Sequence, residues 1–116
     1  MKSVAVIVTY KPEFDQLEQL ICALREQSIN IIIVDNSTEP VTIFPNMRDV
    51  SIITNKCNLG IAKAQNIGIT YALELKAEFI CFFDQDSKVP INFAEGMFNF
   101  RDHKSNAVYF PLIIDE

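Results

Sequence analysis

The sequence of 116 residues predicts an α/β domain with an open, mostly parallel sheet and helices on both faces. Two observations carry this prediction. Short, continuous apolar runs are typical of strands buried on both faces, and helical patterns alternate with them along the chain. Hydrophobic residues make up 49% of the chain, with only three glycines and five prolines, which excludes a disordered or collagen-like sequence. The length fits one domain, residues 1–116.

Strands and helices are expected to alternate along the chain, except that a polar, proline-containing connection at 38–48 joins the second and third strands. We expect strands at 4–8, 29–34, 50–53, 78–83 and 107–114, and helices at 12–28, 60–75 and 92–101. The first helix has Pro12 at its start, where proline is favoured, and apolar residues at three- and four-residue spacing. The second helix contains small residues, among them Gly60 and Gly68, which allow a helix to lie close to a sheet or a ligand.

Charge and cysteine content exclude several classes of protein. Ten basic and fifteen acidic side chains give a formal charge of -5, so we do not expect a nucleic acid as partner. Three cysteines without a CxxC pair, and a single histidine, predict reduced thiols rather than disulfides or a zinc site. No secretory signal is visible, and no apolar run is long enough for a transmembrane segment. We therefore expect a cytoplasmic protein.

Polar residues directly follow three of the expected strands. Thr9 and Tyr10 follow the first strand, Asp35 the second, and Asp84 and Asp86 the fourth. The carboxyl ends of parallel strands share one edge of a sheet, and open α/β sheets bind their ligands there. An aspartate after a strand is often only a helix cap or turn residue, but convergence of all five residues favours a binding site.

The pair Asp84 and Asp86 is a candidate metal site. If the strand stays extended, residues two apart face the same side, and two carboxylates repel each other unless a cation lies between them. Hard oxygen ligands at an open edge suit Mg²⁺ or Mn²⁺, which bridge to substrate phosphates. The sequence has no glycine-rich phosphate loop, so phosphates would bind through the metal and through amides at the start of the second helix, near Asn58 and Gly60.

Four segments together resemble the N-terminal motifs of family-two glycosyltransferases with the GT-A fold. They are VIVTYKP at 6–12, IIVDNS at 32–37, NLGIAKAQNIG at 58–68 and FFDQDS at 82–87. The Asp-Gln-Asp-Ser sequence in the last segment, together with Gly-Ile-Ala earlier in the chain, is similar to the motifs of the bacterial rhamnosyltransferases that build O-antigen and capsule. The resemblance implies that the chain is the Rossmann-like, nucleotide-binding half of a GT-A fold.

The resemblance also implies a nucleotide-sugar site. The residues expected to contact the nucleotide are Thr9, Tyr10, Asp35, Asn58, Gly60, Lys63 and Asp84. Asp35 would bind the pyrimidine or its ribose, and Asp86, beside Asp84, would hold Mg²⁺ or Mn²⁺ on the diphosphate. The implied reaction transfers a sugar such as rhamnose, with inversion, from a dTDP- or UDP-activated donor to a hydroxyl of a saccharide or lipid-linked saccharide acceptor.

In the family, the acceptor side and the catalytic base lie downstream of the Asp-x-Asp motif. We therefore expect the base beyond Glu116, and we expect this chain to be inactive alone. It would be either a part of a longer enzyme, which would lie in the cytoplasm at the inner face of the membrane, or a natural remnant of such an enzyme. Apolar surface left uncovered would promote self-association. A non-catalytic nucleotide-binding or regulatory module is the alternative. A phosphoacceptor receiver domain is disfavoured, because it needs an acidic pair where this chain has Thr9 and Tyr10.

Overall fold

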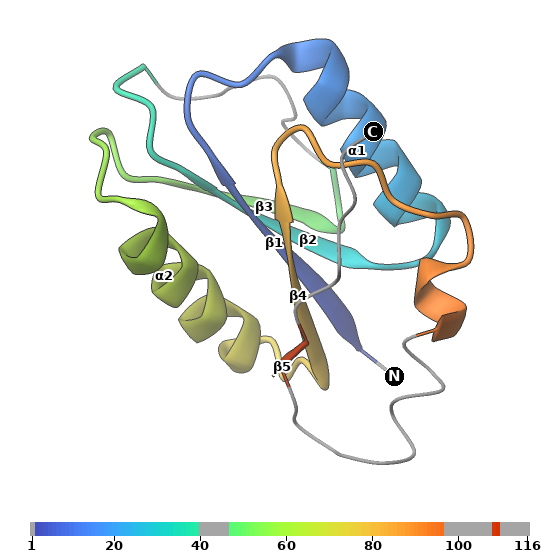
Figure 1. Cartoon of the computed structure of the whole chain (residues 1–116). Helices are drawn as coiled ribbons and strands as arrows, with labels where there is room; N and C mark the ends of the chain where they lie inside the picture. Colours follow the sequence, from blue (N-terminus) through green and yellow to red (C-terminus); the bar gives the residue numbers. More distant parts are fainter. Residues whose placement is uncertain (1, 40–46, 97–107, 110–116) are drawn as a thin grey trace.

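The computed structural model describes residues 2–39, 47–96 and 108–109, and within them five strands form one parallel sheet (Figure 1). The strands are β1 (Ser3–Thr9), β2 (Asn30–Asp35), β3 (Val50–Thr54), β4 (Phe79–Asp84) and β5 (Val108–Tyr109). Their order across the sheet is β3-β2-β1-β4-β5, and every neighbouring pair is parallel. The predicted α/β class with a parallel sheet is confirmed.

Helix α1 (Phe14–Glu26) begins later than predicted. The carboxylate of Glu13 accepts hydrogen bonds from the backbone N–H groups of Asp15 and Gln16, so Glu13 is the N-cap and Pro12 lies outside the helix. The buried side of the helix consists of Leu17, Leu20, Ile21 and Leu24, at the three- and four-residue spacing of its sequence.

Helix α2 (Ile61–Glu74) matches the prediction closely and lies against the other face of the sheet. Gly68 allows α2 to lie close to β1, because a Cβ at this position would be 2.4 Å from Cγ1 of Val6, which is shorter than a van der Waals contact. Of the third expected helix, the structure describes residues 93–96 as helical, after a turn at 91–92, and the remainder to residue 101 lies outside the described residues. The last expected strand is described only as β5.

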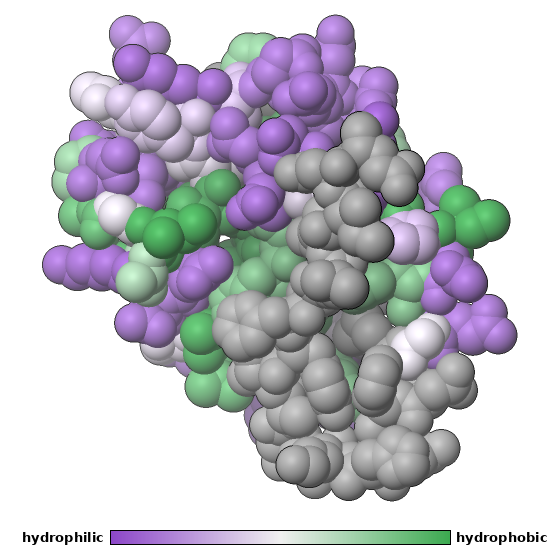
Figure 2. Space-filling view, in the orientation of Figure 1, coloured by the Kyte–Doolittle hydropathy of each residue, from purple (hydrophilic) through white to green (hydrophobic). Residues whose placement is uncertain are grey.

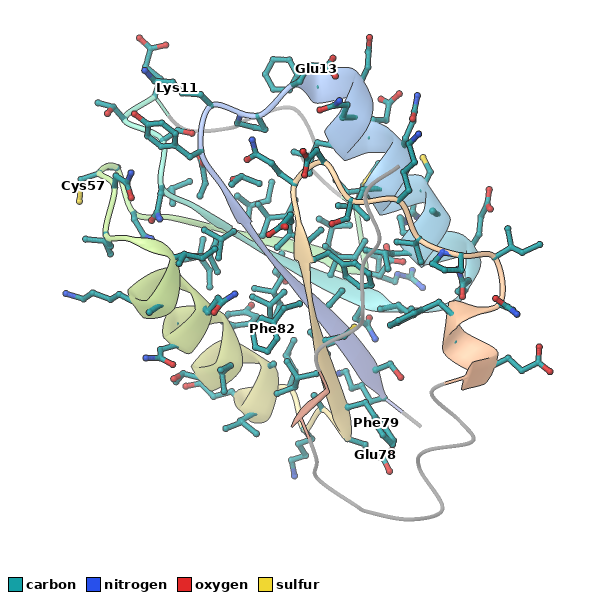
Figure 3. The ribbon with its side chains drawn as sticks, viewed as in Figure 1. Lys11, Glu13, Cys57, Glu78, Phe79 and Phe82 are labelled. Atoms are coloured by element: carbon teal, nitrogen blue, oxygen red, sulfur yellow. The ribbon has the colours of Figure 1, made fainter. Side chains whose placement is uncertain are left out.

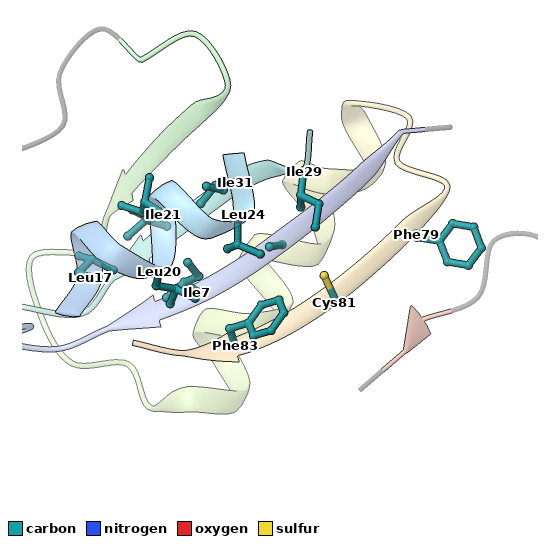
Figure 4. Packing of buried hydrophobic residues seen from close by; sticks show 12 residues of the cluster. Ile7, Leu17, Leu20, Ile21, Leu24, Ile29, Ile31, Phe79, Cys81 and Phe83 are labelled. Carbon is teal, nitrogen blue, oxygen red and sulfur yellow. The ribbon is translucent and has the colours of Figure 1, made fainter. Parts of the chain in front are cut away.

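The sheet is covered on both faces, as predicted. Successive residues of β1 point to opposite faces, so Ala5 and Ile7 pack with α1 while Val4 and Val6 pack with α2. Figure 4 shows α1 lying over β1, with the apolar side chains of both elements between them. None of the helices in the described ranges has the length and apolar character needed to cross a membrane.

The order of the strands reverses beside β1. The chain proceeds from β1 through β2 to β3, and then returns through α2 to β4 on the other side of β1. Open α/β sheets bind ligands outside the carboxyl ends of their strands at such a reversal. The junction between the ends of β1 and β4 is therefore the expected place for a ligand.

Several large apolar side chains are exposed on the described surface. They are Tyr10, Phe14, Ile61, Leu73 and Ile91. Ile61 and Leu73 belong to α2, and the other three come from separate segments. Self-association through apolar surface stays a prediction.

Candidate functional site

The ends of β1, β2 and β4 converge at one edge of the sheet. In the parallel register Thr9 lies opposite Asp35, and Val8 lies opposite Asp84. The structure thus brings the five predicted strand-end residues to one edge: Thr9, Tyr10, Asp35, Asp84 and Asp86.

This edge is distinct from the opposite end of the sheet. Figure 3 shows Lys11 and Cys57 on loops at the carboxyl ends of the strands, whereas Glu78 and Phe79 lie at the other end. In Figure 2 the upper border of the molecule, where β1 and β4 end, is mostly hydrophilic. A polar edge of this kind suits a ligand that carries charge and hydroxyl groups.

Thr9 and Asp35 form the buried floor of the edge. Both side chains have no exposed surface, and the Thr9 hydroxyl donates a 2.9 Å hydrogen bond to Oδ1 of Asp35. The same Oδ1 accepts a 3.1 Å hydrogen bond from the backbone N–H of Ser37. Here the two residues shape the loops above them, and a direct contact of Asp35 with a nucleotide stays a prediction.

Asn36 connects four elements beneath the edge. Its backbone N–H donates to the carbonyl of Thr9 at 2.8 Å, which ties β2 to β1. Its side-chain amide donates to the carbonyl of Gly60 at 3.3 Å, before α2, and its Oδ1 accepts from the Asn55 amide at 2.8 Å, after β3. The Asn36 side chain is almost completely buried, whereas Asn55 is half-buried and Gly60 is exposed, so these bonds are partly shielded from water.

The loop after β1 carries an exposed aromatic ring and a cation. Tyr10 is 43% exposed, and Nζ of Lys11 lies 5.3 Å from the centre of its ring. Lys11 has a φ of 45°, in the left-handed region, and its backbone N–H donates to Oγ of Ser37 at 2.8 Å. The side chain of Gln85 forms two hydrogen bonds with the backbone of Tyr10.

Asp84 is the last residue of β4 and Asp86 lies beyond it on a turn, so the premise that the strand stays extended through both aspartates is wrong. β4 ends at Asp84, and the chain turns at Gln85 and Asp86, with the backbone N–H of Ser87 donating to the carbonyl of Asp84 at 3.0 Å. Alternation therefore cannot place the two carboxylates on the same side. Both aspartates remain exposed at the edge.

The two aspartates supply the carboxylate oxygens that Mg²⁺ and Mn²⁺ prefer, and a metal site at this place stays a prediction. No group of three or more acidic, histidine or cysteine side chains within the described ranges is arranged to hold a metal on its own. Mg²⁺ is commonly held by only one or two carboxylates together with phosphate oxygens and water. Two exposed carboxylates on one turn match that donor set, and a third protein carboxylate is not required.

The start of α2 lies beside the end of β2, where the carbonyl of Gly60 accepts from the Asn36 side chain. Gly60 is the N-cap with φ 83° and ψ 163°, a conformation essentially restricted to glycine, and its backbone N–H donates to Oδ1 of Asn58 at 2.9 Å. No side chain caps the helix, and no acidic residue lies in its first turn. Lys63 in that turn is exposed. The local charge is therefore favourable to an anion.

A pocket of about 210 Å³ lies between α1 and residues 86–89, with Asp86 on its wall. Ser87 also lines it, although its hydroxyl is buried and has no hydrogen-bond partner among the described residues. The pocket therefore lies on the α1 side of the turn at 84–87 that carries Asp84 and Asp86, which we call the acidic turn.

Sequence reasoning missed the residues that connect the predicted ones. Asn36, Ser37 and Gln85 stand within the family motifs, and Asn55 in the loop before the second helix. None of the four is among the predicted site residues, but each forms a hydrogen bond at the edge of the sheet. The available signal was their position directly after a strand, shared with the residues that were selected. Their partners depend on strand register, which the sequence pattern does not contain.

Comparison with known proteins agrees with this architecture. Residues 5–115 match the family described as glycosyl transferase family 2. The chain is also 43% identical over 114 residues to a "dTDP-rhamnosyl transferase RfbF" of Shigella flexneri, an alignment that covers 96% of this chain and 38% of that relative. The chain thus spans well under half of that relative's length. Because the family match extends over nearly all of the residues, the chain belongs to glycosyl transferase family 2.

Proposed function

We propose that this chain is the nucleotide-sugar-binding part of a rhamnosyltransferase that uses a dTDP-activated donor in O-antigen or related polysaccharide synthesis. One observation carries the proposal: the motif residues of a family 2 chain meet at the carboxyl edge of the sheet, where its strand order reverses. The 43% identity with a dTDP-rhamnosyl transferase favours rhamnose and thymidine diphosphate over other donors.

The nucleoside binds over the ends of β1 and β2 in this proposal. The exposed ring of Tyr10 offers a surface for the base, while Thr9 and Asp35 hold the loops beneath it. Asp84, at the exposed end of β4, faces the ribose. Asp35 reaches the base or ribose only if its contacts with Thr9 and Ser37 rearrange.

The diphosphate binds between the acidic turn and the start of α2. Asp86, with Asp84, would hold Mg²⁺ or Mn²⁺, which offsets the negative charge on the leaving diphosphate. The uncapped amides at the start of α2 and the exposed ammonium of Lys63 supply positive charge on the other side. Asn58 keeps Gly60 in the conformation that exposes these amides.

The acceptor in this proposal is a hydroxyl of a saccharide or lipid-linked saccharide, and a carboxylate base deprotonates it. We assign that base to a segment beyond Glu116, in the portion of the relative's length that this chain does not span. Two exposed free thiols, Cys22 and Cys57, suit the reducing cytoplasm, at the inner face of the membrane where such acceptors are used.

Calorimetric titration tests the proposal. We expect dTDP to bind with Mn²⁺ or Mg²⁺ and to lose at least about tenfold in affinity when the metal is removed with EDTA. UDP and ADP serve as the pyrimidine and purine comparisons, and a purine should bind more weakly. Absence of nucleotide binding with either metal contradicts the proposed function.

A further inference from the structure

The middle residue of the Asp-Gln-Asp segment binds the backbone of the neighbouring loop. Oε1 of Gln85 accepts a 2.8 Å hydrogen bond from the backbone N–H of Tyr10, and Nε2 of Gln85 donates a 3.2 Å hydrogen bond to the carbonyl of Tyr10. One side chain therefore pairs with both polar backbone groups of a loop residue 75 positions away.

The geometry of the sheet explains why a side chain is needed here. The register between β1 and β4 ends with Val8 opposite Asp84, and the backbone of β4 then turns away. A strand that continued would offer its own N–H and C=O groups to the next residues of β1. The carboxamide of Gln85 carries the same donor and acceptor as a peptide group, so it continues the pairing beyond the last strand residue.

The loop after β1 is held from its other side as well. The carbonyl of Thr9 accepts from the backbone N–H of Asn36, and the backbone N–H of Lys11 donates to the hydroxyl of Ser37. Gln85 supplies the matching attachment toward β4, across the junction where the strand order reverses. The position of Tyr10 is thus defined relative to both neighbouring strands.

We propose that Gln85 is a positioning residue that fixes the Tyr10 loop relative to the two aspartates on either side of it. The inference rests on the proposed function, in which Tyr10 lies at the base and Asp84 and Asp86 lie at the ribose and metal. A nucleotide that contacts Tyr10 and the two aspartates at the same time requires a fixed distance between the Tyr10 loop and the aspartates. Gln85 maintains that spacing before the ligand arrives, so less ordering accompanies binding.

The chemistry of the side chain limits which residues can replace it. Methionine has a similar length but forms neither hydrogen bond. Glutamate accepts from the N–H of Tyr10 but, when ionised, has no donor for the carbonyl. Asparagine has the correct groups on a side chain shorter by one methylene. Gln85→Met removes the attachment completely, and Gln85→Glu removes half of it.

Gln27 provides a matched control within the same chain. Its Nε2 donates to the carbonyl of Pro90 at 2.8 Å, and its Oε1 accepts from the backbone N–H of Ala94 at 2.8 Å. It therefore makes the same pair of backbone contacts, is half-buried like Gln85, and lies at the far end of α1. Gln27→Met loses equivalent bonds away from the proposed ligand.

The test compares dTDP affinity in the presence of Mn²⁺ with thermal unfolding for both variants. We expect Gln85→Met and Gln27→Met to lower the midpoint of unfolding by similar amounts, and only Gln85→Met to weaken dTDP binding, by about tenfold. Gln85→Glu should weaken it less. If Gln85→Met does not fold, the dTDP affinity of Gln85→Glu tests the positioning role instead. Binding by the Gln85 variants within about twofold of the parent chain overturns the inference.

Backbone hydrogen exchange without nucleotide separates this inference from the proposed function. The Tyr10 amide should exchange at least about tenfold faster in Gln85→Met than in the parent or in Gln27→Met. If the parent does not bind dTDP, both proposals fail. If it binds and the Gln85 variants bind equally well, or if Tyr10 exchange does not change, only the positioning role fails.

Discussion

The Thr9 hydroxyl and the Asp35 carboxylate meet at the ends of two neighbouring parallel strands, 2.9 Å apart and without exposed surface. Because both side chains are buried, the bond stabilises the edge on which the proposed ligand lies. The Asp35 carboxylate also accepts from the backbone of Ser37, so its removal affects more than one partner.

Asp35→Ala should destabilise the domain by about 2–4 kcal/mol, because it leaves the Thr9 hydroxyl and the Ser37 N–H buried with a lost partner. Thr9→Val keeps the side-chain shape and should cost only about 1 kcal/mol. Urea unfolding measures both values. A loss below about 0.5 kcal/mol for Asp35→Ala would contradict the structural role of this pair.

Asp86→Asn should weaken dTDP binding in the presence of Mn²⁺ by at least about tenfold, because it keeps the size of the side chain but removes the charge that attracts the cation. In EDTA the variant and the parent should bind equally. Asp15→Asn, an exposed aspartate in the first turn of α1, is the control and should leave both titrations unchanged. If dTDP binding depends on Mn²⁺ equally in the parent and in Asp86→Asn, Asp86 does not hold the metal.

Gly68→Ala should destabilise the domain by about 1–3 kcal/mol, because the new methyl group would overlap Val6 and push α2 away from the sheet. Gly96→Ala is the matched control, since an added Cβ there meets nothing within 4 Å. That substitution should change stability by less than about 1 kcal/mol. Thermal or urea unfolding measures both. Equal effects of the two substitutions would show that α2 does not need this close approach.

Cys81 should resist alkylation while Cys22 and Cys57 react. Burial raises the pKa of the Cys81 thiol to about 12 from 9.0, although its backbone hydrogen bond acts in the opposite direction. Mass spectrometry after brief treatment with iodoacetamide at pH 8 should show two modified cysteines in the folded chain and three in urea. Rapid modification of Cys81 in the folded chain would contradict its burial.

The same pKa difference predicts an alkaline loss of stability. A raised pKa in the folded chain means that the thiol's contribution is complete below pH 9 and decreases as pH rises from 9.0 toward about 12. The slope from this group is about 1.4 kcal/mol per pH unit. Cys81→Ala lacks this group, so its free energy of unfolding should decrease less steeply over that range.

The chain alone should show no sugar transfer, because we assign the acceptor side and the catalytic base to residues beyond Glu116. Incubation with dTDP-rhamnose, Mn²⁺ and candidate saccharide acceptors should release no dTDP above the buffer blank. Metal-dependent dTDP binding without transfer agrees with the proposed part of an enzyme. Acceptor-dependent release of dTDP by this chain would show that its own residues supply the base.

The sequence by itself determined the class of the fold, the approximate strands and helices, and the edge where polar residues collect. These follow from local patterns: the apolar run before Asp35 and the one before Asp84 are buried strands whatever their neighbours are. Only the tertiary structure decided which polar groups pair. Gln85 meets Tyr10 across 75 residues, and Thr9 meets Asp35 across 26, because the strand register sets these distances. It also decided the path of the chain after Asp84. The end of the apolar run at Phe83 marks the end of the strand to within one residue, but the turn beyond it depends on the hydrogen bond from the Ser87 N–H to the Asp84 carbonyl and on the end of the pairing with β1.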